Sequence, residues 1–256
     1  SSKDVAFTNL SIDEKSFRKG HSYVTVLSSP LAGCVIDIAE GRDGKTTKKL
    51  LEQVIHPKHR DTVETVSVDM WKAYLNSVED ILPKANIVHD RFHLIKYLNE
   101  AIDKVRRREV KQHEELKNSR FALLKNQANL TDKQRIIFEH IQSANYQVSK
   151  AWRVREDFKD IFNSSTTENA FGLFIKWGAS VLNTNIKELV KVAKMFNAHI
   201  KGVINALTSS FSNAMAERLN GKIQEIKTVG RGYRTFKNFR SAILFFHGGL
   251  NLYPHK

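Results

Sequence analysis

The sequence predicts an α/β fold: a mixed five-stranded sheet with flanking helices, interrupted by an all-α insertion. Two different residue patterns along the 256-residue chain lead to this prediction. Residues 1–90 alternate between short runs rich in β-branched and aromatic residues and short helical patterns. From Arg91 the β-like alternation stops, and helical periods continue to about residue 205.

The first three strands are expected over 8–17, 23–27 and 33–38. These runs are rich in β-branched and aromatic residues, and Pro30 and Gly33 mark the turns between the later two. Short connections of this kind favour an antiparallel meander.

A β-α-β pattern follows the meander. Thr46 is expected to open a helix that carries Leu50 and Leu51 and closes at Pro57. A strand over 63–68, a helix over 71–78 and a short buried strand over 86–88 complete the sheet. The last two strands should be parallel, joined by right-handed crossovers.

The all-α insertion shows regular apolar stripes. Thr131 is expected to cap one of its helices, and Ser165 with Glu168 has capping-box spacing before another. The expected division is 1–104 for the first part of the core, 105–205 for the insertion and 206–256 for the second part. The tryptophans lie on apolar stripes and are expected in the core: Trp71, Trp152 and Trp177.

The helix expected over 212–227 has an unusual polar side. Helical steps place one acid among amides and a cation, namely Asn213, Glu217, Asn220, Gln224 and Lys227. The opposite face is apolar, with Met215, Leu219, Ile223 and Ile226. Solvated helix faces usually carry more charge, so Glu217 is expected to have partners elsewhere in the fold.

The charge points to nucleic acid. The formal net charge is +14 and the sequence pI is about 9.8, which is typical of proteins that bind a phosphate backbone. A basic but inert surface, or affinity for anionic membranes, is the alternative. No apolar run is long enough for a membrane span, no signal peptide is recognisable, and the single Cys34 excludes internal disulfides and cysteine-rich zinc sites. A soluble intracellular protein is therefore expected.

Two acids stand at expected strand ends, where catalytic groups of α/β sheets collect. Asp13 ends or interrupts the first strand, and Asp69 follows a buried strand. Asp69 could instead be the N-cap of the next helix. Together with Glu217, these acids suit a hard divalent cation such as Mg²⁺. Asp90 and His93 lie three residues apart, but no third soft ligand nearby favours zinc.

Four separated blocks of the sequence resemble a known family. They are "IDEKSFRKGHSYVTVL", "VSVDMWKAYLNSV", "ILPKANIVHDRFHLIKYLNEAIDKVRR" and the C-terminal stretch from "SNAMAERLNGKIQEIK" to "NLYPH". They are similar to the DDE transposases of bacterial insertion sequences, and most closely to the ISL-three family. The resemblance implies a ribonuclease-H-like catalytic domain in which three acids bind two Mg²⁺ ions, with Mn²⁺ as a substitute, for hydrolysis and strand transfer at transposon ends.

Matched residue by residue, the resemblance makes Asp13, Asp69 and Glu217 the catalytic and metal-binding acids. It places Asp90 and His93 close to the active site, as the family's Asp-x-x-His element. Asn220 could orient Glu217 or touch a phosphate, although a solvent-facing amide is the alternative. Glu14 neighbours Asp13 but should face the other side of the strand.

A basic segment from 218 to 240 is the expected DNA contact, and its alternative is a flexible basic turn between helices. Its glycines would let the backbone approach a polyanion, and Tyr233 could stack on a base. The other expected contacts are Arg218, Lys222, Lys227, Arg231 and Arg234. The basic run 104–111 is a weaker candidate, since charge runs are usually solvated helix faces.

The implied partners are transposon-end and target DNA and further copies of the chain, with no membrane, in the bacterial cytoplasm at the nucleoid. Family members also carry a cysteine-rich zinc segment and a helix-turn-helix before the catalytic domain. This chain shows neither, which suggests a catalytic fragment or a truncated copy. Two other functions remain open: another ribonuclease-H-like nuclease, such as a junction resolvase, and a catalytically silent DNA-binding protein derived from a transposase.

Overall fold

The computed structural model describes residues 6–18, 22–162, 166–208 and 214–249. The chain divides into two compact units. The sheet unit comprises residues 1–90 and 209–256, and the helical unit comprises residues 91–208. The expected boundary after residue 104 falls within α3 (Arg91–Glu109), the first helix of the helical unit.

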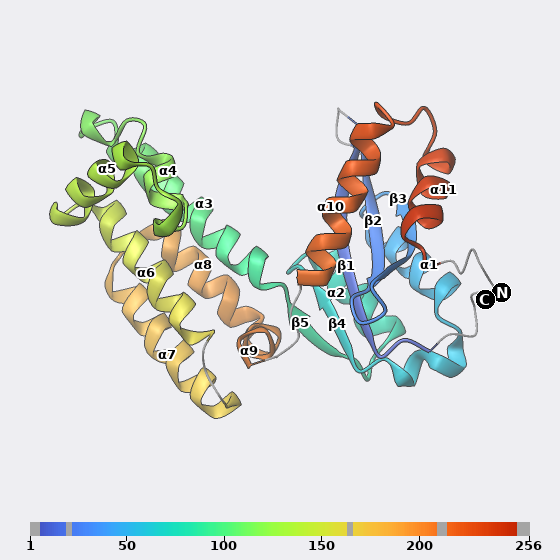
Figure 1. Cartoon of the computed structure of the whole chain (residues 1–256). Coiled ribbons are helices and arrows are strands. Elements are labelled where there is room, and N and C mark those ends of the chain that lie inside the picture. Colours follow the sequence, from blue (N-terminus) through green and yellow to red (C-terminus); the bar gives the residue numbers. More distant parts are fainter. Residues whose placement is uncertain (1–5, 19–21, 163–165, 209–213, 250–256) are drawn as a thin grey trace. The chain divides into compact units, whose positions relative to one another are not determined.

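The sheet unit contains the predicted mixed sheet (Figure 1). Its strand order is β3-β2-β1-β4-β5. The first three strands pair antiparallel, whereas β4 is parallel to both β1 and β5. The strands are β1 (Asn9–Arg18), β2 (Ser22–Ser29), β3 (Cys34–Glu40), β4 (Thr65–Val68) and β5 (Asn86–His89).

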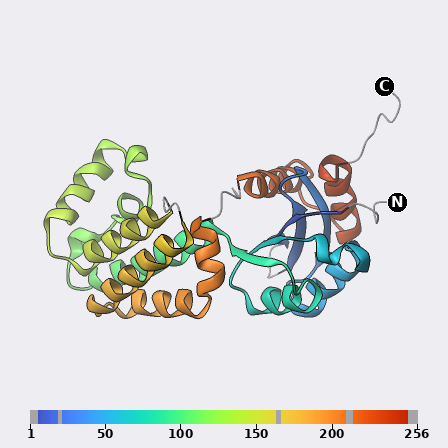
Figure 2. The same cartoon turned by 90° about the horizontal axis from the view of Figure 1, so that it is seen from below.

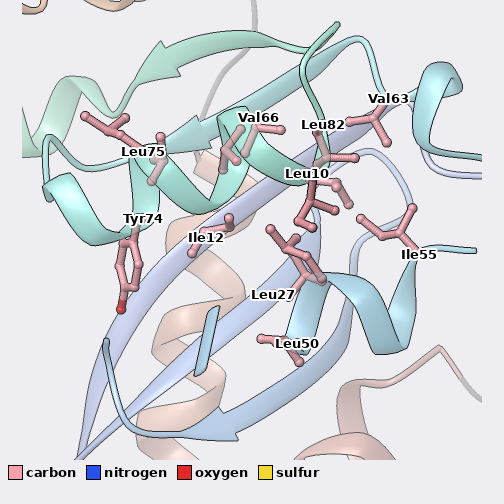
Figure 3. Packing of buried hydrophobic residues seen from close by; sticks show 14 residues of the cluster. Leu10, Ile12, Leu27, Leu50, Ile55, Val63, Val66, Tyr74, Leu75 and Leu82 are labelled. Carbon is pink, nitrogen blue, oxygen red and sulfur yellow. The ribbon is translucent and has the colours of Figure 1, made fainter. Parts of the chain in front are cut away.

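Two helices cover one face of the sheet, α1 (Gly44–Val54) and α2 (Lys72–Ile81), with a short 3-10 helix (Pro57–Thr62) between them. Figure 3 shows their apolar side chains meeting those of β1, β2 and β4, with Leu10, Ile12 and Leu27 at the centre. The expected start of α1 at Thr46 is wrong. Asp43 is the N-cap and accepts a hydrogen bond from the Thr46 backbone N–H, so the helix begins at Gly44.

The C-terminal helices α10 (Ala214–Val229) and α11 (Phe236–His247) cover the opposite face (Figure 2). Leu219 and Ile223 of α10 are buried with Phe239 of α11 against β1, β2 and β3. The apolar face predicted for α10 is therefore confirmed. This packing holds the polar stripe of α10 beside β1.

In the described part of the helical unit, from α3 onward, the regular elements are helices (Figure 1). Phe158, Trp177 and Phe196 stack in its core, with ring centroids 4.8 to 6.0 Å apart. The remaining helices are α4 (Arg120–Leu124), α5 (Asp132–Ser143), α6 (Gln147–Ile161), α7 (Thr167–Asn183), α8 (Lys187–Ala198) and α9 (Ile200–Thr208), with 3-10 turns at Glu114–Leu116 and Gln127–Asn129.

Two helices of this unit, α5 and α7, begin at a side-chain cap. Thr131 forms the predicted cap of α5, as part of a capping box with Gln134. Before α7 the cap is Thr166, whose side chain accepts from the Asn169 backbone N–H. The predicted partner Ser165 lies outside the described residues.

Candidate active site

Asp13 lies within β1 and does not end it, contrary to expectation. What ends there is the pairing with β4, whose last pair is Ile12 with Val68. Asp13 and Asp69 are the residues that directly follow this last pair, so we infer that they lie side by side. Since Ile12 and Val68 point into the core under α1 and α2, strand alternation directs Asp13 to the face that carries α10. The parallel register thus brings the two acids to one edge of the sheet.

The Asp13 carboxylate is held from several directions. Its Oδ2 accepts a hydrogen bond of 2.6 Å from Asn220 Nδ2 of α10 and lies 2.9 Å from Lys15 Nζ. Its Oδ1 accepts from the Glu14 backbone N–H at 2.7 Å. The Asp13 side chain is 17% exposed, so these contacts are partly shielded from water. These contacts hold the Asp13 carboxylate in place.

Glu217 stands one helical turn before Asn220 on α10 and is exposed. Residues three apart on a helix have Cβ atoms about 5–6 Å apart, so the contact of Asn220 with Asp13 places Glu217 beside the same edge. Further along the stripe, Lys227 Nζ donates to the Ser16 carbonyl at 2.7 Å. The polar stripe of α10 therefore follows β1, except for Asn213, which lies outside the described residues.

Asp69 does not cap α2. The N-cap of that helix is Trp71, and no side chain caps it. The Asp69 Oδ1 instead accepts a 2.7 Å hydrogen bond from the Met70 backbone N–H. The alternative interpretation of Asp69 as an N-cap is therefore wrong.

Trp71 is half exposed (50%), which contradicts its predicted place in the core. Its Nε1–H donates to the Arg42 carbonyl at 3.2 Å. The Arg42 guanidinium lies 4.2 Å from the ring centre of Tyr23 and pairs with Glu14 at 3.3 Å. Glu14 thus faces away from the Asp13 side, as predicted. Trp177 is buried as predicted, and Trp152 is half-buried against Phe138.

Asp90 is the last residue of the sheet unit, directly after β5, and His93 is in the first turn of α3 in the helical unit. The preceding His89 is buried, with its Nδ1 3.0 Å from the Val68 carbonyl. His89 therefore fixes the end of β5 to the end of β4, next to Asp69. Sequence reasoning missed His89 and also Lys15, although alternation along β1 puts Lys15 on the Asp13 side.

The predicted DNA-binding segment spans the end of α10 and the turn before α11. Arg218, Arg231 and Arg234 are exposed, and Lys222 is half-exposed. Arg231 and Gly232 adopt positive φ angles of 48° and 88°, which form the turn.

Tyr233 is partly buried against the cluster formed by α10, α11 and the first strands. Its ring lies 5.3 Å from that of Phe239, and a Cβ added to Gly230 would come within 2.8 Å of it. Arg18 Nη2 donates to the carbonyls of Tyr233 and Arg234, which ties the turn to β1. Gly230 therefore makes room for an aromatic ring.

Three arginines of the weaker candidate, the basic run 104–111, form ion pairs within the helical unit. Arg106 and Arg107 pair with Asp103 at 2.8 and 2.7 Å, and Arg108 pairs with Glu188 at 2.6 Å.

The donor chemistry of the edge suits a hard divalent cation, because Asp13, Asp69 and Glu217 offer carboxylate oxygens. Within the described ranges, no three His, Cys, Asp or Glu side chains gather closely enough to hold a metal ion. Asp13 Oδ2 is instead occupied by Asn220 and Lys15. A search of the described helices finds none that is long and apolar enough to cross a membrane.

Comparison with known proteins identifies the family. A transposase family model, that of the ISL-three DDE transposases, matches residues 10–243. The transposase for insertion sequence element IS1001 of Bordetella parapertussis is 28% identical over 238 residues, covering 90% of this chain. The transposase for insertion sequence element IS1557 of Mycobacterium tuberculosis is 25% identical over 260 residues, again covering 90% of this chain. The chain spans 58% of the length of each relative. The family match contains both strand-edge acids and the helix that carries Glu217, and the chain belongs to the ISL-three family of DDE transposases.

Proposed function

We propose that the sheet unit catalyses metal-dependent DNA cleavage and strand transfer at insertion-sequence ends. The observation that carries the proposal is the hydrogen bond from Asn220 to Asp13, with Asp69 level with Asp13 and Glu217 one turn from Asn220. This bond joins residues 207 positions apart in the chain and so supports a site formed between β1, which carries Asp13, and α10, which carries Glu217.

Divalent metal is generally used by DDE transposases, the family of this chain. We infer that Asp13, Asp69 and Glu217 would hold two Mg²⁺ ions, with Mn²⁺ as a substitute. When bound, such ions activate the attacking oxygen and stabilise the leaving oxygen. To bind at Asp13, they would displace the Lys15 ammonium from Oδ2 and leave Asn220 to orient the carboxylate.

The reaction is two in-line displacements at phosphorus. In the first, a water oxygen bonds to the phosphorus, the bond to the 3′ oxygen breaks, and a free 3′ hydroxyl results. In the second, that hydroxyl bonds to a phosphorus of target DNA, and the bond from this phosphorus to the 3′ oxygen of the target strand breaks, which leaves a 3′ hydroxyl on the target. Asp90 and His93 support the site, while the exposed Arg218, Arg231 and Arg234 contact the phosphate backbone.

The partners follow from this chemistry. They are transposon-end and target DNA, at the nucleoid, and a second copy of the chain, since two ends must be processed together. The relatives are named transposases of insertion sequence elements, which supports this substrate.

The test is a calorimetric titration with Mn²⁺ of the parent chain and the variants Asp69→Asn and Glu217→Gln. Glu225→Gln is the matched control, since Glu225 is an exposed acid on the same helix. Binding that weakens at least tenfold in the two site variants, and stays unchanged in the control, supports the proposal. Metal binding to the parent that neither site variant alters refutes it.

A second measurement separates the enzyme from a silent DNA-binding protein. The parent should cleave end-containing DNA with Mn²⁺ and not in EDTA, and Asp69→Asn should be inactive with its fold intact. A junction resolvase would instead prefer branched DNA over transposon ends.

A further inference from the structure

A groove of about 440 Å³ lies between α3 and α4, wholly within the helical unit. These two helices pack against each other (Figure 1). Four cations and two acids line the groove: Lys96, Lys104, Arg107, Arg120, Glu100 and Asp103. We call it the α3 groove. Its lining carries a surplus of two positive charges.

The cations on α3 are arranged along one face. Lys96, Glu100 and Lys104 follow one another at four-residue steps, so they form a single row along the helix. Lys96 and Lys104 are about 12 Å apart along the axis, because each residue rises about 1.5 Å. A nucleic-acid strand passes several phosphates over such a distance, given about 3.4 Å of helix axis per charge of one strand.

Asp103 is already neutralised within the protein. Its side chain is 8% exposed and pairs with Arg106 at 2.8 Å and Arg107 at 2.7 Å, with Arg120 of α4 at 3.8 Å. Burial pushes the pKa of Asp103 upward, but the hydrogen bonds and charges of Arg106 and Arg107 outweigh it and hold the pKa below its usual value. Asp103 therefore fixes the guanidinium of Arg107 at the groove, where its side chain is 67% exposed.

The two lysines differ from these arginines. Both are exposed, and among the described residues no carboxylate forms an ion pair with either. Phe92, also in the lining, is 58% exposed and lies one further step along the same row. An exposed aromatic ring beside a row of cations is a common arrangement for single-stranded nucleic acid, because bases stack on the ring and phosphates meet the cations.

We propose that the α3 groove binds the sugar-phosphate backbone of DNA through Lys96, Lys104 and Arg120. The contact belongs to the helical unit and uses none of the acids Asp13, Asp69 and Glu217. It rests on the proposed function, which supplies DNA as the substrate. An acidic polypeptide is the competing occupant, and the experiment below separates the two.

The test is fluorescence anisotropy of labelled DNA, single- and double-stranded, with the full chain in EDTA over a series of salt concentrations. The variant Lys96→Glu with Lys104→Glu removes two cations of the groove. The matched control is Lys150→Glu with Lys176→Glu, two exposed lysines on α6 and α7 with the same change in net charge. Circular dichroism and the thermal midpoint check that both variants fold like the parent.

The groove variant should lose at least tenfold in affinity, and its slope of log K against log salt should fall by about 2, one phosphate contact per lysine. The control should stay within about twofold. In addition, Glu100→Gln should tighten binding, because it removes the acid between the lysines. Opposite effects of the two groove variants are not expected from a structural role.

Equal losses in the groove variant and the control would overturn the proposal, because net charge alone would explain them. It would also be overturned if the parent failed to bind DNA, or if polyglutamate displaced DNA as efficiently, charge for charge, as unlabelled DNA does. The metal titration of Asp69→Asn needs no DNA. A result that refutes the groove proposal can therefore be distinguished from one that refutes the proposed metal site.

Discussion

Asn220 connects α10 to β1 through a 2.6 Å hydrogen bond to Asp13. Hydrogen bonds to charged groups contribute about 1.5–3 kcal/mol when buried, and less where water has access. We expect Asn220→Ala to lower the free energy of unfolding in urea by about 1 kcal/mol and to weaken Mn²⁺ binding. The control is Gln224→Ala, an exposed residue one turn further on. Unchanged Mn²⁺ affinity in Asn220→Ala would show that Asn220 contributes to stability and not to metal binding.

Tyr74 makes the sheet unit sensitive to alkaline pH. Burial raises the pKa of Tyr74 far above its usual value of 10, and its hydroxyl lies 3.3 Å from Thr25 Oγ1. The raised pKa means that the fold favours the neutral phenol. Its contribution to stability is therefore complete below pH 10 and is lost progressively above it, where the unfolded chain ionises first.

Tyr74→Phe removes this ionisation. The free energy of unfolding of the parent should fall more steeply than that of the variant between about pH 9.5 and 11.5. At neutral pH the parent should be at least as stable as the variant, because it keeps the hydrogen bond to Thr25. Parallel curves for the two proteins would contradict the expected cost of ionising Tyr74.

At the scale of elements, Arg155 of α6 joins three helices of the helical unit. Its guanidinium is 2% exposed and donates to Asn99 Oδ1 of α3 at 2.7 Å and to the Leu123 carbonyl of α4 at 3.0 Å. Glu156, 2.8 Å away, balances the charge. Arg155 therefore satisfies polar groups of two neighbouring helices from the core.

We expect Arg155→Met to destabilise the chain by about 3–5 kcal/mol, the usual cost of removing one partner from a buried charged network. Arg153→Met is the matched control, since Arg153 is exposed on the same helix with one 3.3 Å bond. It should change stability by at most about 0.5 kcal/mol. Chemical unfolding followed by tryptophan fluorescence measures both. Similar midpoints for the two variants would show that Arg155 is dispensable.

At the scale of the whole molecule, each compact unit has its own core. Phe196 is fully buried in the helical unit against Phe158 and Trp177. We expect Phe196→Ala to cost about 3–5 kcal/mol. Because the units are separate clusters of contacts, amide exchange should accelerate in residues 91–208 while the strands of the sheet unit keep their protection. Equal acceleration in β1 and β4, measured by mass spectrometry, would show that the chain unfolds as one cooperative unit.

The sequence alone predicted most of the strands and helices and the residue types of the candidate site. Local residue patterns predicted the five strands, the apolar face of α10 and the change at Arg91 from alternating strands and helices to helices. The exact start of a helix was less reliable, as Thr46 shows, because one polar residue can serve several neighbouring positions. Residue types, net charge and the family blocks indicated which acids to examine.

Only the tertiary structure decided which of these groups meet. The parallel register of β1 with β4 sets Asp13 level with Asp69, and the packing of α10 brings Asn220 onto Asp13. It also decided that Trp71 lies half exposed on the backbone of Arg42 and that Tyr233 packs on Phe239. The physical reason is that periodicity is a local property. Strand register and helix docking depend instead on contacts between residues far apart in the chain, which no single stretch of sequence contains.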